Sequence, residues 1–180
     1  MKVFKFGGAS VKDAQGVRNV ARVLEAFKQD DLLIVVSAMG KTTNALEKVV
    51  EAFYNGNRDL AFQLLQQIKH QHAGVAKELL SINYISCEAK LIELFAKAES
   101  LINEKAVRSF DHYYDQIVCI GELLSTSIIS AYLQEAGIPN HWVDVREFFL
   151  TDNNFRDANI DWNTSQSRVK ENIVPLFQNS

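Results

Sequence analysis

The pattern of the first 37 residues is the feature that most limits the possible folds. Residues 2–6 (KVFKF) have the composition of a short strand that ends in Gly7-Gly8, and residues 13–28 carry the apolar stripe of an amphipathic helix. The continuous apolar run at residues 32–36 (LLIVV) follows, and its length and β-branched content predict a strand buried on both faces. This strand–helix–strand order predicts an α/β fold with a parallel sheet.

The remainder of the chain has mostly helical spacing. Helical stripes run through residues 42–55, 61–68 and 91–102, and through one long segment from about 111 to 135. Residues 141–145 (HWVDV) predict a third strand, and the tail from about residue 161 is weakly helical. So few strands for so many helices favour either a helical subdomain on a small sheet or a segment of a longer chain.

Composition excludes several classes of protein. The 180 residues are 47% hydrophobic and 23% charged, as in a globular domain with a real core, and the net charge of −3 argues against nucleic-acid binding. The two cysteines and four histidines lack metal-ligand spacing, so no protein-bound metal is expected. The start has no signal-peptide pattern, and the aliphatic run at residues 32–36 is too short to span a bilayer. We therefore expect a cytoplasmic protein without a nucleic-acid or membrane partner.

A first candidate loop follows the first strand. Lys5, Gly7, Gly8 and Ser10 lie in the sequence KFGGAS, at the carboxyl end of that strand, where α/β sheets bind ligands. Glycines let backbone amides approach a phosphate closely, serine can donate to a phosphate oxygen, and lysine supplies a positive charge. A tight turn with a solvent-facing lysine explains the same residues equally well.

A second candidate loop follows the second strand. The sequence from Ser37 to Asn44 (SAMGKTTN) contains the GKT of a P-loop, but Val35 stands where the first P-loop glycine belongs, which argues against that motif. A ligand loop beside the first one, with hydroxyl groups and a helix N-terminus behind it, is the more economical interpretation. Helix capping by Thr42 or Thr43 is compatible with it.

Glu122 is the one charged residue between Asp115 and Glu135. A carboxylate in such an apolar helix lies either at a solvent-exposed seam or in a pocket that holds a cation. Gly121 beside it costs about 1 kcal/mol relative to alanine in a helix, so close packing or a ligand is expected there.

Taken together, KFGGAS, VVSAMGKTTN, GELLS and WVDVREF resemble the aspartate kinases of the amino acid kinase superfamily, in order and over essentially the whole chain. The resemblance implies a three-layer α/β sandwich of the carbamate kinase-like type with a mostly parallel sheet. It implies that residues 1–180 are the N-terminal, amino-acid-binding part of the kinase domain, with a helical insert at about 57–108. The nucleotide half and the regulatory ACT domains are not found in this sequence.

The resemblance also implies transfer of the γ-phosphate of ATP, taken with Mg²⁺, to the side-chain carboxylate of L-aspartate. This gives 4-phospho-L-aspartate, the first step towards lysine, threonine and methionine. By the resemblance, Lys5 is the catalytic lysine that stabilises the transferring phosphoryl group, and Gly7, Gly8 and Ser10 contact the phosphates. Aspartate is bound by residues that the resemblance places at Ser37, Ala38, Thr43 and Glu122, with Glu122 holding its ammonium group.

Two departures and two alternatives stay open. Ala9 stands where the family commonly has threonine, and Lys41-Thr42 replaces a commoner glycine-aliphatic pair, which adds a positive charge near the site. We expect the 180 residues alone to lack kinase activity, and a homo-oligomer is possible in the full-length enzyme. A kinase of glutamate or a related carboxylate, or a non-catalytic domain that binds small molecules, would explain parts of the same pattern.

Overall fold

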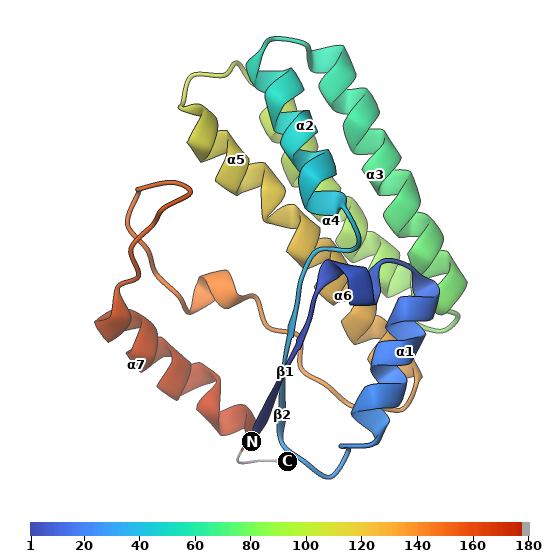
Figure 1. Cartoon of the computed structure of the whole chain (residues 1–180). Helices are drawn as coiled ribbons and strands as arrows, with labels where there is room; N and C mark the ends of the chain where they lie inside the picture. Colours follow the sequence, from blue (N-terminus) through green and yellow to red (C-terminus); the bar gives the residue numbers. More distant parts are fainter. Residues whose placement is uncertain (178–180) are drawn as a thin grey trace. The chain divides into compact units, whose positions relative to one another are not determined.

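The structure is a computed structural model that describes residues 1–177. The chain divides into two compact units, one of residues 1–140 and one that begins at residue 141. Each unit is described by itself below, and Figure 1 shows the order of their elements along the chain.

The first unit begins with the predicted strand–helix–strand order. Strand β1 (Lys2–Phe6) passes through the 3₁₀ helix η1 (Gly8–Val11) and helix α1 (Ala14–Glu25) to strand β2 (Leu32–Val36). The strands are parallel, and their register runs from the pair Lys2 and Leu32 to the pair Phe6 and Val36. The predicted bounds of both strands and the α/β class are therefore confirmed.

One face of this two-stranded sheet is open, so the prediction that residues 32–36 are buried on both faces is wrong. The side chains of Val3, Leu33 and Val35 are 60%, 38% and 47% exposed. On the other face the Phe4 ring lies tilted against the Phe27 ring, with ring centroids 5.0 Å apart and 54° between the ring planes, and β2 packs against helix α6 (Ile120–Glu135). Alternate residues of a strand point to opposite faces, and only one face is covered by the described residues.

Five helices build the layer that carries the hydrophobic core. They pack in the order α2, α3, α4, α6, and α5 packs against α2 (Figure 1). Side chains with almost no exposure fill the space between them, among them Leu46, Leu65, Phe95, Ile117 and Leu124. The bounds of these helices are α2 (Thr42–Tyr54), α3 (Arg58–Leu79), α4 (Tyr84–Asn103), α5 (Phe110–Val118) and α6 (Ile120–Glu135).

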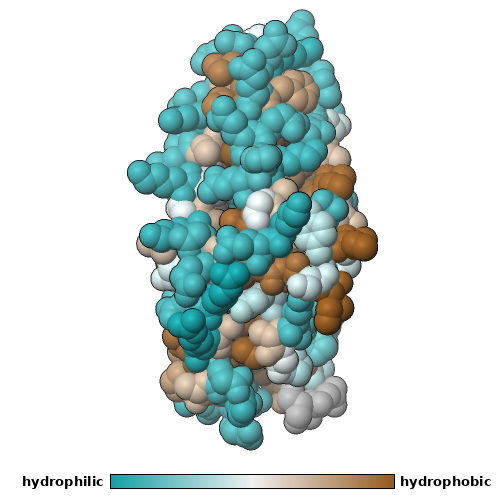
Figure 2. Space-filling view, turned by 90° about the vertical axis from the view of Figure 1, so that its right-hand side faces the viewer, coloured by the Kyte–Doolittle hydropathy of each residue, from teal (hydrophilic) through white to brown (hydrophobic). Residues whose placement is uncertain are grey.

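The outer side of α1 and α3 is mostly hydrophilic. Figure 2 shows this side of the molecule with apolar side chains only in scattered places. Arg18 of α1 reaches across to α3, where its guanidinium forms an ion pair with the Glu78 carboxylate at 2.9 Å and donates to the Glu78 backbone carbonyl at 3.0 Å. This ion pair links the outer faces of the two helices.

The single long helix predicted for residues 111–135 is two helices. α5 ends at Val118 and α6 begins at Ile120, with Cys119 between them at dihedral angles still close to helical. By length and composition, Phe110–Glu135 is the one helical run among the described residues apolar enough to cross a membrane, but half of its most apolar window is buried inside the fold. The core helix of a folded domain has the same pattern.

The predicted third strand at residues 141–145 is wrong. The second unit contains the 3₁₀ helices η2 (Val145–Glu147) and η3 (Val174–Phe177) and helix α7 (Trp162–Asn172). The Asp144 carboxylate accepts a hydrogen bond from the Arg146 amide at 3.0 Å and forms an ion pair with its guanidinium at 2.6 Å, which favours a helical turn. A strand also needs a neighbour, and none pairs with this segment in the described chain.

The Glu135 carboxylate ties the end of α6 to the turn between α3 and α4. Its two oxygens accept hydrogen bonds from the backbone amides of Ser81 at 2.8 Å, and of Ile82 and Asn83 at 3.2 Å each. The Asn83 side-chain amide donates to the Ala131 carbonyl at 3.3 Å. Three amides of one turn are therefore satisfied by a single side chain that lies more than fifty residues along the chain.

Glu135→Gln should lower the unfolding free energy at neutral pH and flatten its acid dependence. The hydrogen bond from the Ser81 amide has the largest effect and holds the pKa of the Glu135 carboxyl below its ordinary value of 4.5. Burial opposes this lowering, and weaker contributions from the Asn83 and Ile82 amides add to it. A depressed pKa contributes stability that is present above the ordinary value and is lost as pH falls through the lower, folded-state value.

Urea denaturation between pH 7 and pH 3 measures this effect. The difference between wild type and Glu135→Gln should be largest near pH 7 and shrink below about pH 4.5. Glu51→Gln, which changes an exposed carboxylate of α2 that forms no ion pair within residues 1–177, is the matched control. Identical pH profiles for the two variants would contradict the role assigned to Glu135.

Candidate functional site

Two loops meet at the carboxyl ends of β1 and β2. Loop 1 comprises Gly7–Ser10 and loop 2 comprises Ser37–Lys41. The Gly40 amide of loop 2 donates to the Gly8 carbonyl of loop 1 at 3.0 Å, and the Ser37 amide donates to the Phe6 carbonyl at 3.0 Å. The predicted neighbourhood of the two loops is therefore seen directly in their hydrogen bonds.

Gly8 lies where the two loops come closest. A Cβ atom at this position would lie 2.7 Å from the Ala38 carbonyl oxygen and 2.9 Å from that of Gly40. Both of these atoms belong to the backbone, so a side chain at Gly8 would push the loops apart. Gly40 has a φ of +54°, in the left-handed region that favours glycine.

Lys5 extends from β1 on the open face of the sheet and reaches loop 1. The side chain is exposed, and its Nζ lies 3.6 Å from the position that a Cβ of Gly7 would take. Within residues 1–177 it forms no ion pair. The exposed ammonium group could meet an anion over Gly7 and Gly8, and it fits the alternative of a solvent-facing lysine equally well.

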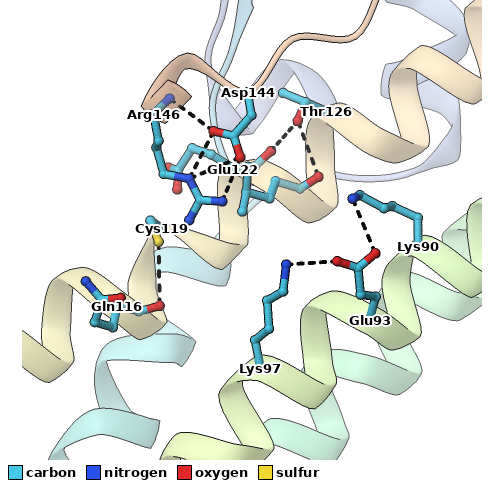
Figure 3. A network of polar contacts seen from close by, with 10 residues as sticks. Lys90, Glu93, Lys97, Gln116, Cys119, Glu122, Thr126, Asp144 and Arg146 are labelled. Carbon is cyan, nitrogen blue, oxygen red and sulfur yellow. Dashed lines mark hydrogen bonds and ion pairs between the residues drawn. The ribbon is translucent and has the colours of Figure 1, made fainter. Parts of the chain in front are cut away.

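Helix α6 brings Glu122 to the other side of loop 2. The Glu122 Oε1 accepts a long hydrogen bond of 3.4 Å from the Ala38 amide, and the side chain is half-buried. The Thr126 hydroxyl, one turn further, donates to the backbone carbonyls of Glu122 at 2.7 Å and Leu123 at 3.3 Å (Figure 3). Glu122 thus lies partly shielded beside loop 2, and whether it holds a cation there stays a prediction.

Gly121 explains why α6 can approach so closely. A Cβ here would lie 3.0 Å from the Ala38 Cβ, 3.2 Å from a Leu46 methyl group and 3.4 Å from the Thr42 Cγ2. The glycine is thus required by packing, and this contact holds Glu122 next to loop 2. Close packing was one of the two explanations expected for a glycine at this helical position, where glycine is less favourable than alanine.

The two threonines at the start of α2 have different environments. Thr42 is buried, and its hydroxyl donates to the Met39 carbonyl at 2.7 Å, so it closes loop 2 onto the helix. The hydroxyl of Thr43 has no hydrogen-bond partner in the described part of the chain, and its side chain is half-buried. Of the two, Thr43 has the hydroxyl that a ligand can use.

Contacts join most of the predicted site residues, but not all of them. The two loops link a set made up of Lys5, Gly7, Gly8, Ala38 and Glu122. Ser37 belongs to loop 2 through its amide. The side chains of Ser10, which is exposed, and Thr43, which is half-buried, form no hydrogen bond with the other predicted residues in the described chain, although the Ser10 amide donates to the Gly7 carbonyl at 2.9 Å. Their assignment to phosphate and aspartate stays a prediction.

Sequence reasoning missed Lys12 and Gly16. The Cβ of Lys12 lies 3.6 Å from the position of a Gly40 Cβ, so the residue after η1 touches loop 2. A Cβ at Gly16 would lie 2.6 Å from the Ser10 carbonyl oxygen, which fixes loop 1 on the first turn of α1. A glycine in the first turn of an amphipathic helix was the signal available, because glycine is unfavourable there without a close neighbour.

Other titratable groups give no alternative centre. Burial raises the pKa of the Cys87 thiol to about 11, which leaves it protonated and unreactive at neutral pH. Burial also lowers the pKa of His72, whose Nδ1 lies 2.8 Å from the Ile68 carbonyl oxygen in the core. In residues 1–177 no three His, Cys, Asp or Glu side chains are grouped so that they could hold a metal ion.

Comparison with known proteins places this geometry among the amino acid kinases. The model of the Amino acid kinase family matches residues 1–179. Aspartokinase 2, chloroplastic, of Arabidopsis thaliana is 33% identical over 97% of this chain and 34% of its own length. The aspartokinase of Chlamydia trachomatis is 30% identical over 98% of this chain and 39% of its own. The chain thus spans about a third of the length of these relatives.

Solved structures agree in fold. Escherichia coli aspartokinase III in complex with aspartate and ADP superposes with a TM-score of 0.84 at 26% identity, over 99% of this chain and 38% of that one. The same enzyme in complex with lysine and aspartate gives a TM-score of 0.85 at 24% identity, over 98% of this chain and 38% of that one, which is a likeness in fold. The arrangement of β1, β2 and the helical layer is therefore an established one.

Gly8→Ala should destabilise the first unit by about 1–3 kcal/mol, because overpacking against fixed backbone atoms costs that much. The reason is the 2.7 Å approach to the Ala38 carbonyl oxygen. Gly7→Ala is the matched control, since its φ of −77° suits alanine and its nearest neighbour would be the flexible Lys5 ammonium. Urea denaturation of both variants measures the difference, and equal midpoints would show that the close approach is not a constraint.

Proposed function

Because the chain belongs to the amino acid kinase family, we propose that it supplies the amino-acid-binding part of an aspartate kinase. The reaction is attack of the aspartate side-chain carboxylate on the γ-phosphorus of ATP. A carboxylate oxygen–phosphorus bond forms, the bond from the γ-phosphorus to the β–γ bridging oxygen breaks, and ADP leaves with that electron pair. The product is 4-phospho-L-aspartate, which feeds the synthesis of lysine, threonine and methionine.

One observation carries this proposal. The Glu122 carboxylate and the Lys5 ammonium flank the same pair of loops, Glu122 through the Ala38 amide and Lys5 over Gly7. An amino acid with an acidic side chain has an ammonium group at one end and a nucleophilic carboxylate at the other. Glu122 can therefore hold the ammonium end, and the mobile Lys5 ammonium group can neutralise charge where the carboxylate meets the transferred phosphoryl group. Phosphoryl transfer depends chiefly on such positioning and charge neutralisation.

We propose the following roles for the single residues, as the resemblance to aspartate kinases implies them. Glu122 holds the ammonium group of aspartate, and Ser37, Ala38 and Thr43 line the remainder of the amino acid. Lys5 neutralises charge on the transferring phosphoryl group, and loop 1 offers Gly7, Gly8 and Ser10 to the phosphates. Mg²⁺ would arrive with the nucleotide, held by its phosphates and by water, and would neutralise phosphate charge. We place the protein in the cytoplasm.

The comparisons support a substrate of this class. Aspartokinase III of Escherichia coli has been solved in complex with both aspartate and ADP, and the relatives from Arabidopsis thaliana and Chlamydia trachomatis are called aspartokinases. The chain spans about a third of the length of these relatives, and we propose the same activity and substrates for the whole protein of which it is a part. The chain by itself is tested first for aspartate binding.

Glu122→Gln should weaken aspartate binding about 10- to 100-fold, the equivalent of the roughly 1.5–3 kcal/mol of a hydrogen bond to a charged group. Glutamine keeps an oxygen that accepts the Ala38 hydrogen bond, so loop 2 retains its contact with α6 and only the charge is lost. Isothermal titration calorimetry with the 180-residue chain measures the affinity.

Succinate is the matched ligand for this experiment because it carries both carboxylates of aspartate but no ammonium group. Its affinity should be the same for wild type and Glu122→Gln. Glu93→Gln, which removes an exposed charge between Lys90 and Lys97 on α4 (Figure 3), controls for a general loss of charge. Equal loss of aspartate and succinate binding would show that Glu122 does not recognise the ammonium group.

Lys5→Ala should lower kcat about 100-fold or more with little change in the KM for aspartate, as expected for a group that acts mainly in the transition state. The assay is aspartate-dependent ADP formation by a protein that joins this segment to the remaining two thirds of an aspartokinase. Lys48→Ala, an exposed lysine on α2, is the control. A Lys5→Ala enzyme with unchanged turnover would remove Lys5 from this role, and preference for glutamate over aspartate would identify a different amino acid kinase.

A further inference from the structure

Helix α4 carries an apolar stripe on a face that points away from the core. The stripe consists of Ile85, Ala89, Ile92 and Ala96, which recur at intervals of four, three and four residues and therefore share one face of the helix. All four side chains are exposed, Ile85 to 80% and Ile92 to 52%. A different face of α4 supplies the buried residues that pack against α3 and α6.

The turn before α4 adds a third exposed isoleucine. Ile82 is 84% exposed, although its backbone is held in place by the hydrogen bond of 3.2 Å from its amide to the Glu135 carboxylate. An anchored turn and a regular helix thus present three isoleucines to solvent. Single apolar side chains on a surface are ordinary, but a row at this spacing is typical of a helix that packs against another helix.

Large and small side chains alternate along the stripe, which makes it complementary to a second copy of itself. In two antiparallel copies of α4, with a two-fold axis between residues 90 and 91, Ile85 of one copy lies level with Ala96 of the other. Ile92 then lies level with Ala89, so every isoleucine of the stripe faces an alanine, as close packing of two helices favours. In a parallel pair each residue would face itself, and the alanines would leave gaps.

The charges on one side of α4 agree with the antiparallel arrangement. Lys90, Glu93 and Lys97 lie there, and Glu93 pairs with Lys97 at 2.8 Å and with Lys90 at 3.4 Å (Figure 3). The two-fold axis sets this side against the same side of the second copy. A rise of about 1.5 Å per residue then places Glu93 of one copy within about 3 Å, measured along the helix, of the level of Lys90 of the other. Opposite charges can therefore pair across the edge of the interface.

The carboxylates on the other side of α4 do not oppose this arrangement. Glu88 accepts a hydrogen bond from the Tyr84 hydroxyl at 2.6 Å, and Glu99 forms an ion pair with Lys69 at 3.3 Å. On this side each carboxylate is at least five residues, or about 7.5 Å along the helix, from the level of those of the second copy. Solvent and salt weaken repulsion between exposed charges at such separations.

We propose that the exposed face of α4 is a homodimer interface, at which two copies of this chain pack antiparallel through Ile85, Ala89, Ile92 and Ala96. The proposal is independent of the aspartate site, because the two loops and Glu122 belong to other elements of the chain. One pair of helices is smaller than the interface of about 1,200–2,000 Å² that a tight complex needs. We therefore expect a dissociation constant on the order of 10–100 µM.

Sedimentation velocity of the 180-residue chain, over a dilution series that spans this range, measures the association. Ile92→Asp should weaken the dimer at least about tenfold, because a carboxylate would have to be buried against Ala89 of the second copy. Val3→Asp is the matched control, since Val3 is an equally exposed apolar residue (60%) on the open face of the sheet. It should leave the dissociation constant within about twofold of wild type.

A size swap tests the antiparallel register. Ala89→Ile makes the stripe more apolar, but its new side chain would meet Ile92 of the second copy, so association should weaken about tenfold. Ile92→Ala alone should also weaken it, because a gap is left. The double variant with Ala89→Ile and Ile92→Ala again sets a large residue against a small one, and it should return to within about threefold of wild type.

These variants distinguish a specific interface from general adhesion of apolar surfaces. Positions 89 and 92 are exposed in the free chain, so the urea midpoints at low protein concentration should stay close to wild type. A chain that stays monomeric throughout the dilution series would overturn the proposal, as would a loss for Val3→Asp equal to that for Ile92→Asp. Stronger association of Ala89→Ile than of wild type would also overturn it, because adhesion without a fixed register predicts that result.

Discussion

The approach of two backbone loops at Gly8 is the constraint on which the site depends. Loop 1 and loop 2 touch where the Gly40 amide donates to the Gly8 carbonyl, and any side chain at Gly8 would collide with the carbonyl oxygens of Ala38 and Gly40. Because both strands are parallel and in register, their carboxyl ends deliver the loops to the same place. The sheet therefore sets the spacing of the loops, and the missing side chain permits their contact.

Helix α6, which comes much later in the sequence than the two loops, completes the arrangement of the site. Gly121 packs against Ala38, and this brings Glu122 within hydrogen-bond distance of the Ala38 amide. The helix is itself held by its buried apolar residues, such as Leu124 and Ile128, and at its far end by Glu135. A carboxylate that belongs to a core helix is thus rigidly placed beside a loop, which is what precise recognition of a small ligand requires.

Features that depend on local sequence pattern could be predicted well, and features that depend on contacts between distant parts of the chain could be predicted less well. Strands at 2–6 and 32–36, the α/β class and the neighbourhood of the loops followed from apolar spacing and glycine positions. The expected burial of residues 32–36 on both faces did not follow from the sequence. An apolar composition permits burial of both faces of a strand but does not show which face a neighbouring element covers. The HWVDV segment has strand-forming residues, yet the ion pair of Asp144 with Arg146 and the lack of a pairing partner in the described chain favour a turn. The contact of Lys12 with Gly40 had no signature at all, since it depends on how η1 ends.

The turn at Ser81–Asn83 has a chemical likeness to anion receptors. Three successive backbone amides converge on one carboxylate, and such nests of amides bind free anions elsewhere in proteins. Here the anion is covalently part of the chain, so it is present at a constant effective concentration and never has to be captured from solution. Because the Glu135 carboxylate already occupies these three amides, a free anion such as phosphate cannot bind to them.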